Sequence, residues 1–481
     1  MKKLHPTQLW LLLFTLICAI AFLMSNLTKS VNNSSGPKPA AFYSQIPSSN
    51  LKITNWQTKN KINVYFVRAT ELPMIDIELM FKAGSVYEPQ KPGVAALTNA
   101  MLIEGTKNHS AEEISETLES IGANYGSEVS KDYSSVSLRS LTENSKFTKA
   151  LTTFNDILAN ANFPSKNFNR VKNQTLETLK LNQQYPENIS SEEFYKIIYK
   201  THPYAIPVSG TIPAVQKITQ KDLVAFYNKY YNQNTAQISI VGDVTEDQAR
   251  SISEQIAVNL KTGPAASELP SVSTTNPDKI TNVTKHINFP STQTHILLGS
   301  IGIKRSDPDY FALTVGNHIL GTMPLTSLLF KHVRIENGLA YSVSSRFFAM
   351  KDEGPFIINM QTRNEKASEA LNISKETLAN FLTHGPTSDQ LDMAKQNLVG
   401  QFPLNIASNS KKLDIISTIG FYNLPLDYLD QYINNVNNVT SAEITAAFKK
   451  HIDLNNLVIV TVGDNNNQPN ANSSLRANNG R

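Results

Sequence analysis

Cysteine is almost absent from this sequence: the one cysteine, Cys18, lies in an apolar stretch near the start. A single thiol excludes an intramolecular disulfide and any zinc site built on cysteines. Excess charge is also missing, because 44 lysines and arginines face 40 acidic residues, the formal net charge is only +4, and no long basic run occurs. Nucleic-acid binding needs a concentrated positive surface. We therefore expect no nucleic-acid partner.

Charge is missing altogether from Leu9–Met24, which follows Lys2 and Lys3. Positive charge before an apolar run is typical of an export signal or a signal anchor. The run is short for a spanning helix, which takes about 20 residues, and no clean small-residue cleavage site follows, so the cleaved and the anchored forms both stay open. We expect residues 1–30 to be this signal and residues 31–50, polar and rich in proline and serine, to be a tether. The protein would then be periplasmic, or anchored to the inner membrane facing the periplasm.

Two stretches of the chain repeat each other. Residues 218–243 and 439–464 align without a gap at an offset of 221 residues, and both end in Val-Gly-Asp. Each has the pattern of a threonine N-cap, an amphipathic helix, a polar turn and a strand. Between them, residues 261–280 are rich in proline, serine and threonine, as linkers are. We therefore expect two similar halves, at residues 51–260 and 281–464.

Patterns along the chain predict its local elements. The β-rich runs 62–68 and 75–83 are separated by a turn and predict a hairpin. Ser110, followed three residues later by Glu113, predicts a capping box at the start of a helix. The final stretch, residues 465–481, is rich in asparagine and has little that is apolar, so we expect it to be a disordered tail.

Four motifs stand in a fixed order along this duplicated chain. The first three are Ala83-Gly84-Ser85 with Glu88-Pro89, the run Gly93–Thr106 (GVAALTNAMLIEGT), and His202-Pro203-Tyr204; the last is Val333-Arg334 with Gly338-Leu339-Ala340-Tyr341. In this order they resemble the pitrilysin/insulinase family of zinc peptidases, which are inverzincins, and most closely its short bacterial and mitochondrial-processing-type members. The resemblance implies an α+β fold. It would consist of two homologous α/β-sandwich halves, each an antiparallel-rich sheet with helices, forming a clamshell.

The zinc motif of that family lacks its zinc-binding residues in this sequence. Family members bind zinc with the two histidines of H-x-x-E-H and with a glutamate on a later helix. In this sequence the histidine positions are Ala96 and Ala100, the catalytic glutamate position is Asn99, and the later glutamate falls at or near Glu177. One carboxylate cannot complete a site of three protein ligands, and an amide has no useful proton affinity for a general base. We predict a degenerate zinc motif with no catalytic metal in this chain, and a helix-surface or hydrogen-bonded role for Glu177.

The second half keeps a different family feature. Members carry an arginine and a tyrosine seven residues apart that face the zinc from the other domain, and Arg334 and Tyr341 keep this spacing. A guanidinium and a phenol stabilise the charge that develops on a carbonyl oxygen, by about 3 kcal/mol per well-placed donor. The plainer alternatives are an ion pair of Arg334 with Glu336 or Asp352 and strand packing of Tyr341. The preceding loop, Gly321–Leu329, has one glycine where the family loop is glycine-rich, so we expect it to be stiffer and more apolar.

These features lead to two hypotheses. In the first, the chain is the non-zinc subunit of an exported heterodimeric metallopeptidase, and it supplies Arg334 and Tyr341 to the H-x-x-E-H site of a homologous partner. Zinc would then belong to the partner, this chain would need no cofactor and would be inactive alone, and substrate peptides would add as a strand to a sheet edge. In the second, the chain is a non-catalytic structural or peptide-binding subunit of a membrane-associated complex. A peptidase acting alone would need a metal site that the sequence does not offer.

Overall fold

The computed structural model describes residues 51–88, 90–272 and 282–464. The predicted signal, tether and tail, and part of the predicted linker, lie outside these residues, so their assignments stay predictions. Within the described ranges, none of the helices combines the length and the apolar character that crossing a bilayer requires.

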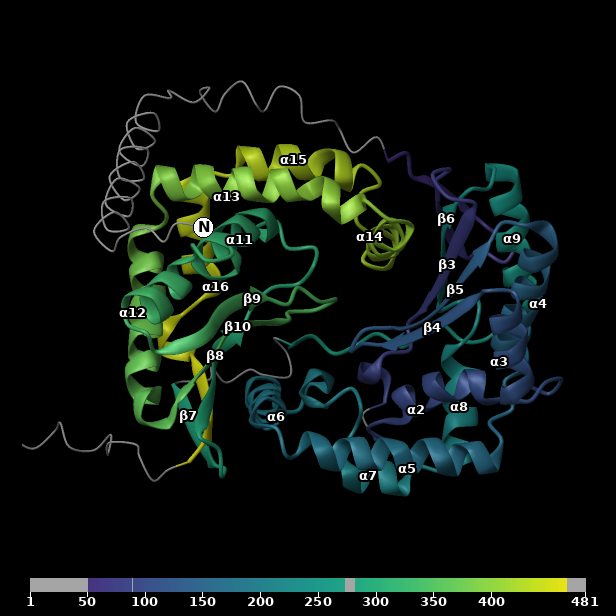
Figure 1. Ribbon diagram of the computed structural model, residues 1–481, viewed down its shortest axis with the longest axis horizontal. Coiled ribbons are helices and arrows are strands. Elements are labelled where there is room, and N and C mark those ends of the chain that lie inside the picture. Colours follow the sequence, from purple (N-terminus) through teal and green to yellow (C-terminus); the bar gives the residue numbers. More distant parts are fainter. Residues whose placement is uncertain (1–50, 89, 273–281, 465–481) are drawn as a thin grey trace, which may run out of the picture. The chain divides into compact units, whose positions relative to one another are not determined.

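The first half is built on a mixed six-stranded sheet with the strand order β1-β2-β6-β3-β5-β4 (Figure 1). Its strands are β1 (Thr54–Gln57), β2 (Asn63–Arg68), β3 (Met74–Phe81), β4 (Asn124–Val129), β5 (Ser134–Leu141) and β6 (Ala236–Gly242). Its α-helices are α2 (Val94–Met101), α3 (Ala111–Ser120), α4 (Asn144–Asn160), α5 (Ser165–Asn182), α6 (Pro186–Tyr199), α7 (Ile212–Lys217), α8 (Gln220–Tyr230) and α9 (Glu246–Asn259). Short 3₁₀ turns are η3 (Ser85–Tyr87), η4 (Leu102–Glu104) and η5 (Pro203–Ala205).

The second half has a five-stranded sheet with the order β7-β11-β8-β10-β9. Its strands are β7 (Val283–Asn288), β8 (Gln293–Ile301), β9 (Ala340–Phe347), β10 (Pro355–Arg363) and β11 (Val458–Gly463). Its α-helices are α11 (Tyr310–Asn317), α12 (Ala367–His384), α13 (Ser388–Gln401), α14 (Asn409–Phe421), α15 (Tyr428–Asn438) and α16 (Ser441–His451). Two π-helical turns, η6 (His318–Thr322) and η7 (Phe330–Glu336), and three 3₁₀ turns, η8 (Asn364–Lys366), η9 (Phe402–Ile406) and η10 (Leu454–Asn456), complete it.

The internal duplication predicted from the sequence is present in the fold. Strand β2 runs parallel to β6 just as β7 runs parallel to β11, and the next strand in each sheet, β3 or β8, is antiparallel. The two repeated helices, α8 and α16, both begin with a capping box, at Thr219 with Asp222 and at Thr440 with Glu443. Each capping box satisfies backbone N–H groups that a helix end otherwise leaves unpaired. The α+β class and the two homologous halves are therefore confirmed.

The predicted hairpin is wrong. Strands β2 and β3 are consecutive in the chain, but β6 lies between them and pairs with both. The pairing Phe66–Ile240 on one side of β6 and Ile77–Ile240 on the other shows how the strand fills the gap. All three strands are largely buried, and a strand buried on both faces and at both edges takes its partners from distant parts of the chain.

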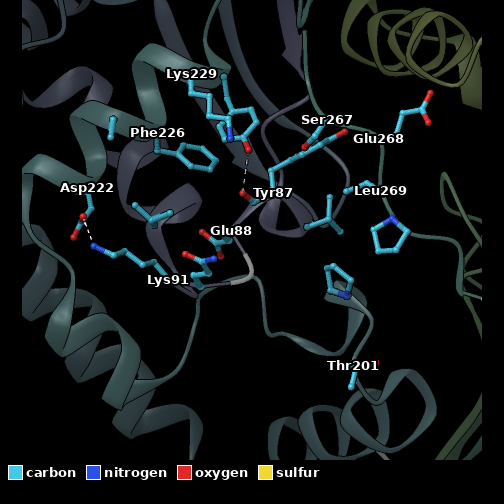
Figure 2. Close-up of a pocket in the computed structure, with 17 residues that line it drawn as sticks. Tyr87, Glu88, Lys91, Thr201, Asp222, Phe226, Lys229, Ser267, Glu268 and Leu269 are labelled. Atoms are coloured by element: carbon cyan, nitrogen blue, oxygen red, sulfur yellow. Dashed lines mark hydrogen bonds and ion pairs between the residues drawn. The ribbon is translucent and has the colours of Figure 1, made fainter. Parts of the chain in front are cut away.

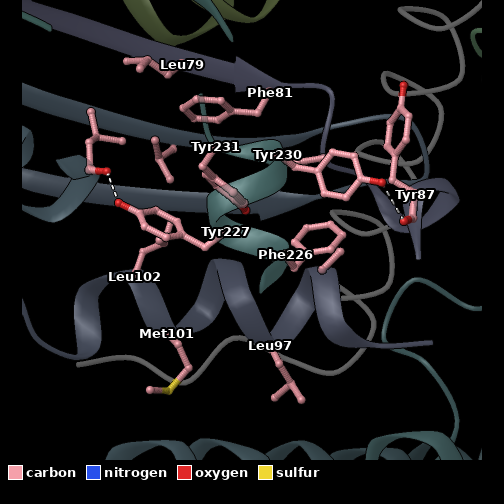
Figure 3. Close-up of a cluster of buried hydrophobic side chains, with 14 of the residues drawn as sticks. Leu79, Phe81, Tyr87, Leu97, Met101, Leu102, Phe226, Tyr227, Tyr230 and Tyr231 are labelled. Carbon is pink, nitrogen blue, oxygen red and sulfur yellow. Dashed lines mark hydrogen bonds between the residues drawn. The ribbon is translucent and has the colours of Figure 1, made fainter. Parts of the chain in front are cut away.

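The core of the first half lies between β3, α8 and α2. Figure 3 shows Tyr227, Tyr230 and Tyr231 at the end of α8, between α2 and the strand that carries Phe81. The rings of Phe81 and Tyr231 lie with their centroids 4.8 Å apart. The hydroxyl of Tyr227 donates to the carbonyl oxygen of Leu158 at 2.5 Å, and that of Tyr230 donates to the carbonyl oxygen of Tyr87 at 3.3 Å. Buried tyrosines bring a polar end that needs a partner, and these find one in the backbone.

The two halves exchange one helix each. Helix α6 of the first half packs against β8 and β11 of the second sheet, and α14 of the second half packs against β6, β3 and β2 of the first sheet. The two helices occupy equivalent places in the repeat, since α14 begins about one repeat length after α6. Each half thus completes the cover of the other half's sheet.

Candidate functional site

Helix α2, at the position of the family's zinc helix, is anchored at its first turn by Glu88. The carboxylate of Glu88 accepts from the backbone N–H of Gly93 at 2.8 Å and from that of Ala95. Gly93 has φ 101°, a conformation that only glycine adopts without strain. Burial raises the pKa of Glu88 to about 8, against the lowering effect of the N–H donors.

A cavity of about 730 Å³ opens beside this first turn (Figure 2). Its apolar walls come from Val94 of α2, from Phe226 of α8 and from Leu269, which follows α9 in the chain. An ion pair between Lys91 and Asp222 lies at its edge. The residues that line the cavity include no histidine and no cysteine, and the one group with metal-ligand spacing in the described residues lies elsewhere.

Asn99, at the position of the family's catalytic glutamate, is part of the core. Only 2% of its surface is exposed. Its side-chain amide donates to the carbonyl oxygen of Ser135 at 3.1 Å and contacts the hydroxyl of Tyr231 at 3.2 Å. Burial raises the pKa of Tyr231 to about 12, so that hydroxyl stays neutral. The asparagine therefore ties α2 to β5 and α8.

The other three positions of the motif do not fit zinc. Ala96 and Ala100 carry no donor atom, whatever the fold around them. Glu177 lies on α5, which packs against α2, but its side chain is 67% exposed and pairs with Lys180 at 2.7 Å. A zinc site needs three or four nitrogen, sulfur or oxygen ligands around one point, and these residues supply at most one.

Arg334 and Tyr341 are brought together by the turn from η7 to β9. The guanidinium of Arg334 lies 4.8 Å from the centre of the Tyr341 ring and 4.8 Å from that of Phe330. Tyr341 is 80% exposed. The ion-pair alternatives named above are not formed: Glu336 pairs with Lys331, the Asp352 carboxylate accepts from the N–H of Val272, and within the described part of the chain Arg334 has no carboxylate partner.

The loop Gly321–Leu329 is packed against its surroundings near both ends. A Cβ at Gly321 would lie 2.2 Å from the hydroxyl oxygen of Ser345, so the backbone passes β9 too closely for any other residue. Ser327 and Leu329 are buried, whereas Leu325 between them is 70% exposed. The loop thus packs at its ends and presents an apolar side chain at its tip.

The His202-Pro203-Tyr204 motif belongs to a buried connection between the halves. The hydroxyl of Tyr204 donates to Asp132 at 2.6 Å. Asp132 also accepts from the hydroxyl of Tyr422 at 3.1 Å and from the N–H of Lys351 at 2.9 Å. Sequence reasoning missed Asp132, because its partners stand 72, 219 and 290 residues away and no local pattern marks it.

One group of three side chains in the described residues has the spacing of metal ligands: Asp307, Asp309 and His451. His451 lies 2.9 Å from the Asp309 carboxylate, and Lys450 lies 2.6 Å from the same carboxylate. Since Lys450 already pairs with Asp309 and the His451 ring lies against the same carboxylate, the group is explained as a polar cluster that joins the end of α16 to the start of α11.

Comparisons with known proteins agree with this picture. A family model described as insulinase (peptidase family M16) matches residues 66–212, and one described as the peptidase M16 inactive domain matches residues 217–398. The crystal structure of a peptidase M16 inactive domain from Pseudomonas fluorescens is similar, with a TM-score of 0.83 and 37% identity over 87% of this chain and 99% of that one.

Two curated relatives show how the names of such proteins divide. An uncharacterized zinc protease of Rickettsia felis is 26% identical over 402 residues, which cover 81% of this chain and 95% of the relative. A protein of Helicobacter pylori named as a non-peptidase homolog is also 26% identical, over 406 residues, 84% of this chain and 92% of the relative.

The fold, together with a helix α2 that carries no zinc ligands, defines a peptidase-like protein of the inactive type. Two halves with the peptidase architecture are present, but the first lacks the residues that hold and use zinc. The chain belongs to peptidase family M16, the insulinase family.

Proposed function

We propose that this chain is the non-zinc subunit of an exported heterodimeric peptidase and that it supplies Arg334 and Tyr341 to the H-x-x-E-H zinc site of a homologous partner. The supporting observation is the Arg334–Tyr341 pair. The guanidinium lies 4.8 Å from the tyrosine ring, and that ring is 80% exposed. Among the described residues, no buried contact accounts for an exposed phenol beside an arginine that has no carboxylate partner.

The chemistry follows from the peptide bond. When water attacks a scissile carbonyl, negative charge develops on the carbonyl oxygen. The Tyr341 hydroxyl can donate a hydrogen bond to that oxygen and the Arg334 guanidinium can offset its charge, and each such donor is worth about 3 kcal/mol in a preorganised site. The partner's zinc would supply the activated water, and this chain would hold and polarise the substrate.

The test is co-purification followed by turnover. The chain would be produced together with the homologous H-x-x-E-H chain of the same genome, and cleavage of a fluorogenic peptide library would be followed. We expect Arg334→Ala and Tyr341→Phe each to lower kcat about 100-fold, with the heterodimer intact by light scattering.

The matched control is Arg363→Ala, because Arg363 is an exposed arginine of the second half whose one ion pair among the described residues is with nearby Glu365, at 3.5 Å. Its removal should leave turnover unchanged. Equal turnover in the native complex and in both site variants would remove the proposed role, and failure of any H-x-x-E-H chain to co-purify would remove the heterodimer.

A second candidate function is a non-catalytic structural or peptide-binding subunit. The loop Gly321–Leu329 favours it, because Gly321 lies against β9 and Ser327 and Leu329 are buried, whereas a loop that admits substrates is expected to move. The 730 Å³ cavity at the start of α2 gives such a subunit space for a ligand. In this case the two site variants would leave turnover of any co-purifying peptidase unchanged.

A further inference from the structure

A second cavity, of about 160 Å³, lies at one end of the first sheet, where the sheet meets the end of α14. Residues at the start of β2, the end of β3 and the start of β6 line it from the first half, and Gly420, Phe421 and Asn423 line it from the second. Gly420 brings α14 close to the sheet, because a Cβ at this position would lie 2.5 Å from the side-chain nitrogen of Gln237. The chain then turns at Asn423, whose φ is 54°, and the cavity lies between this turn and the sheet.

The cavity carries positive charge without an acid to balance it. Lys61, just before β2, and Lys82, just after β3, both line it, whereas no aspartate or glutamate does. Among the described residues, neither ammonium group has a carboxylate partner or a hydrogen-bond acceptor. Lys82 is half-buried, so water can offset its charge only in part. The cavity therefore lacks an anion.

Lys61 stands at a turn position where glycine or asparagine is usual. In the turn between β1 and β2 its φ is 62°, and its backbone N–H donates to the carbonyl oxygen of Thr58 at 2.8 Å. A lysine in this left-handed conformation is strained, whereas glycine and asparagine adopt it readily. Because the turn itself does not need a lysine, the strain points to a role for the side chain, and that side chain brings charge to the cavity.

The surroundings of Lys82 disfavour its charged form. Burial lowers the pKa of Lys82, and the charge of Lys351, which belongs to the second half, lowers it further. Asp132 lies near Lys351, but its carboxylate accepts from the N–H of Lys351 and from the hydroxyls of Tyr204 and Tyr422, and it does not line the cavity. Two lysines, one from each half, thus repel each other, and an anion beside Lys82 would offset this repulsion.

Uncharged groups of the cavity can donate hydrogen bonds as well. The side-chain oxygen of Asn63 accepts from the side chain of Gln57 at 2.9 Å, which leaves the NH₂ group of Asn63 available. The side-chain amide of Asn423 makes no hydrogen bond within the part of the chain that the structure describes. The cavity therefore offers two ammonium groups and two amide NH₂ groups to a ligand.

These donors indicate the class of ligand. Ammonium and amide N–H groups bind the oxygens of phosphate, sulfate and carboxylate, and their hydrogen bonds are stronger when the acceptor is charged. The cavity is well below the range of about 300–1,000 Å³ that is typical for drug-sized ligands, so it admits one small group. A metal cation would meet two positive charges and no acid.

We propose that this cavity binds one small oxyanion, held by Lys61 and Lys82 and by the side-chain amides of Asn63 and Asn423. Because these donors come from both halves, the bound anion would join the first sheet to the end of α14. It would also relieve the repulsion between the lysines of the two halves, and so stabilise the contact between them.

Two sources could supply the oxyanion. One is a free inorganic anion such as phosphate, and the other is the carboxylate at the C terminus of a peptide. Both offer charged oxygens of similar size, and the two probes of the test below distinguish them. The inference goes beyond the proposed function and does not depend on it, since neither Arg334 nor Tyr341 lines the cavity.

The test measures binding to the purified full chain by isothermal titration calorimetry, at low ionic strength and in a buffer without other oxyanions. The first probe is sodium phosphate, and its control is sodium chloride at the same ionic strength. The second probe is acetyl-trialanine with a free carboxylate, and its control is the same peptide with a C-terminal amide. We expect at least one probe to bind with one site per chain, at least about tenfold more tightly than its control.

Two variants locate the binding site. Lys82→Gln should weaken binding of the oxyanion at least about tenfold, and Lys61→Gln about threefold or more, because Lys82 is the more buried of the two. Lys221→Gln removes an exposed lysine of α8 outside the cavity and should change nothing. The proposal is overturned if neither probe binds more tightly than its control, or if both cavity variants bind the probe as tightly as the native chain.

Thermal melts provide a second measurement on the same variants. A ligand that binds only the folded chain stabilises it, so the oxyanion should raise the Tm of the native chain more than that of Lys82→Gln. Equal rises in the two chains would reveal a general salt effect and contradict the site. Lys61→Gln, at an exposed turn position, keeps the test decisive if Lys82→Gln folds poorly.

The two probes also identify the source of the anion. Binding of phosphate without binding of the peptide supports a free inorganic anion. Binding of the peptide that is lost on amidation supports a peptide C terminus. Because turnover is not measured and no partner chain is present, a negative result here leaves the Arg334–Tyr341 role to be judged by its own experiment.

Discussion

The positions that the resemblance assigns to the two sides of the family's active site differ sharply in their surroundings in this chain. In the first half, the zinc-helix position Asn99 is 2% exposed and bonded within the core, whereas in the second half Tyr341 is 80% exposed beside Arg334. Packing and hydrogen bonding account for Asn99. They do not account for Tyr341, which contributes little to a core it does not enter.

The difference shows that a residue at a zinc-helix position can serve the packing of the core instead of binding metal. A helix without metal ligands still has to pack against its surroundings, and Asn99 hydrogen-bonds to the hydroxyl of Tyr231 and to the backbone of β5. A residue at the surface has no such duty. Measurements of the free energy of unfolding therefore distinguish the two places. Substitutions at α2 should change it strongly, and substitutions of Arg334 or Tyr341 should change it weakly.

The largest effect on stability should come from Glu88, which anchors the start of α2. Burial raises its pKa from 4.5 to about 8, so the folded chain holds a proton that the unfolded chain releases between these values. The free energy of unfolding then falls as the pH rises from about 5 to about 8, by about 1.4 kcal/mol per pH unit at most. Below about pH 4.5 this contribution is complete. The measurement is urea denaturation across this pH range.

Glu88→Gln should flatten that dependence, because glutamine does not titrate and its carbonyl oxygen can still accept one of the two N–H donors. Glu116→Gln, at an exposed position of α3, should keep the native pH dependence. If the unfolding free energy of Glu88→Gln fell with pH as steeply as that of the native chain, the stability around α2 would not depend on the proton of the Glu88 carboxyl group.

Asn99 gives the next largest effect. Replacing Asn99 by alanine removes the donor to the Ser135 carbonyl and the contact with the Tyr231 hydroxyl, and leaves both groups buried. We expect a loss of about 2 kcal/mol in the free energy of unfolding. Ala100→Ser, one residue along on the exposed side of α2, should change it by less than about 0.5 kcal/mol. If Asn99→Ala left the free energy of unfolding unchanged, the contrast between Asn99 and the Arg334–Tyr341 pair would not hold.

The smallest effects should come from the exposed residues. Tyr341→Phe keeps the ring, and Glu177→Ala removes an exposed ion pair with Lys180; each should change the unfolding free energy by less than about 0.5 kcal/mol. Arg334→Ala removes a half-buried side chain and its cation–π contact with the exposed Tyr341 ring, which is worth about 0.5–1 kcal/mol. Thermal melts of the three variants beside Asn99→Ala check this order. A severe loss in Tyr341→Phe would give Tyr341 a structural role.

Much of the fold could be predicted from local patterns. The capping box of Ser110 with Glu113 is formed at the start of α3, because a cap involves residues three apart and needs no other part of the chain. The duplication was visible because residues 218–243 and 439–464 each specify a helix followed by a strand. The hairpin prediction was wrong because it considered only neighbouring segments. Strand β6, which lies far along the chain, inserts between β2 and β3, and no local turn pattern indicates a distant strand.

What the sequence by itself determined is the loss of the zinc ligands, because the methyl groups at Ala96 and Ala100 cannot coordinate a metal in any fold. It also determined the family and the two repeated halves. Only the tertiary structure decided that Asn99 is a core residue, that Asp132 joins the halves, and that two lysines line one cavity without an acid. Those facts depend on contacts between residues far apart in the chain, which arise only when burial brings distant segments together.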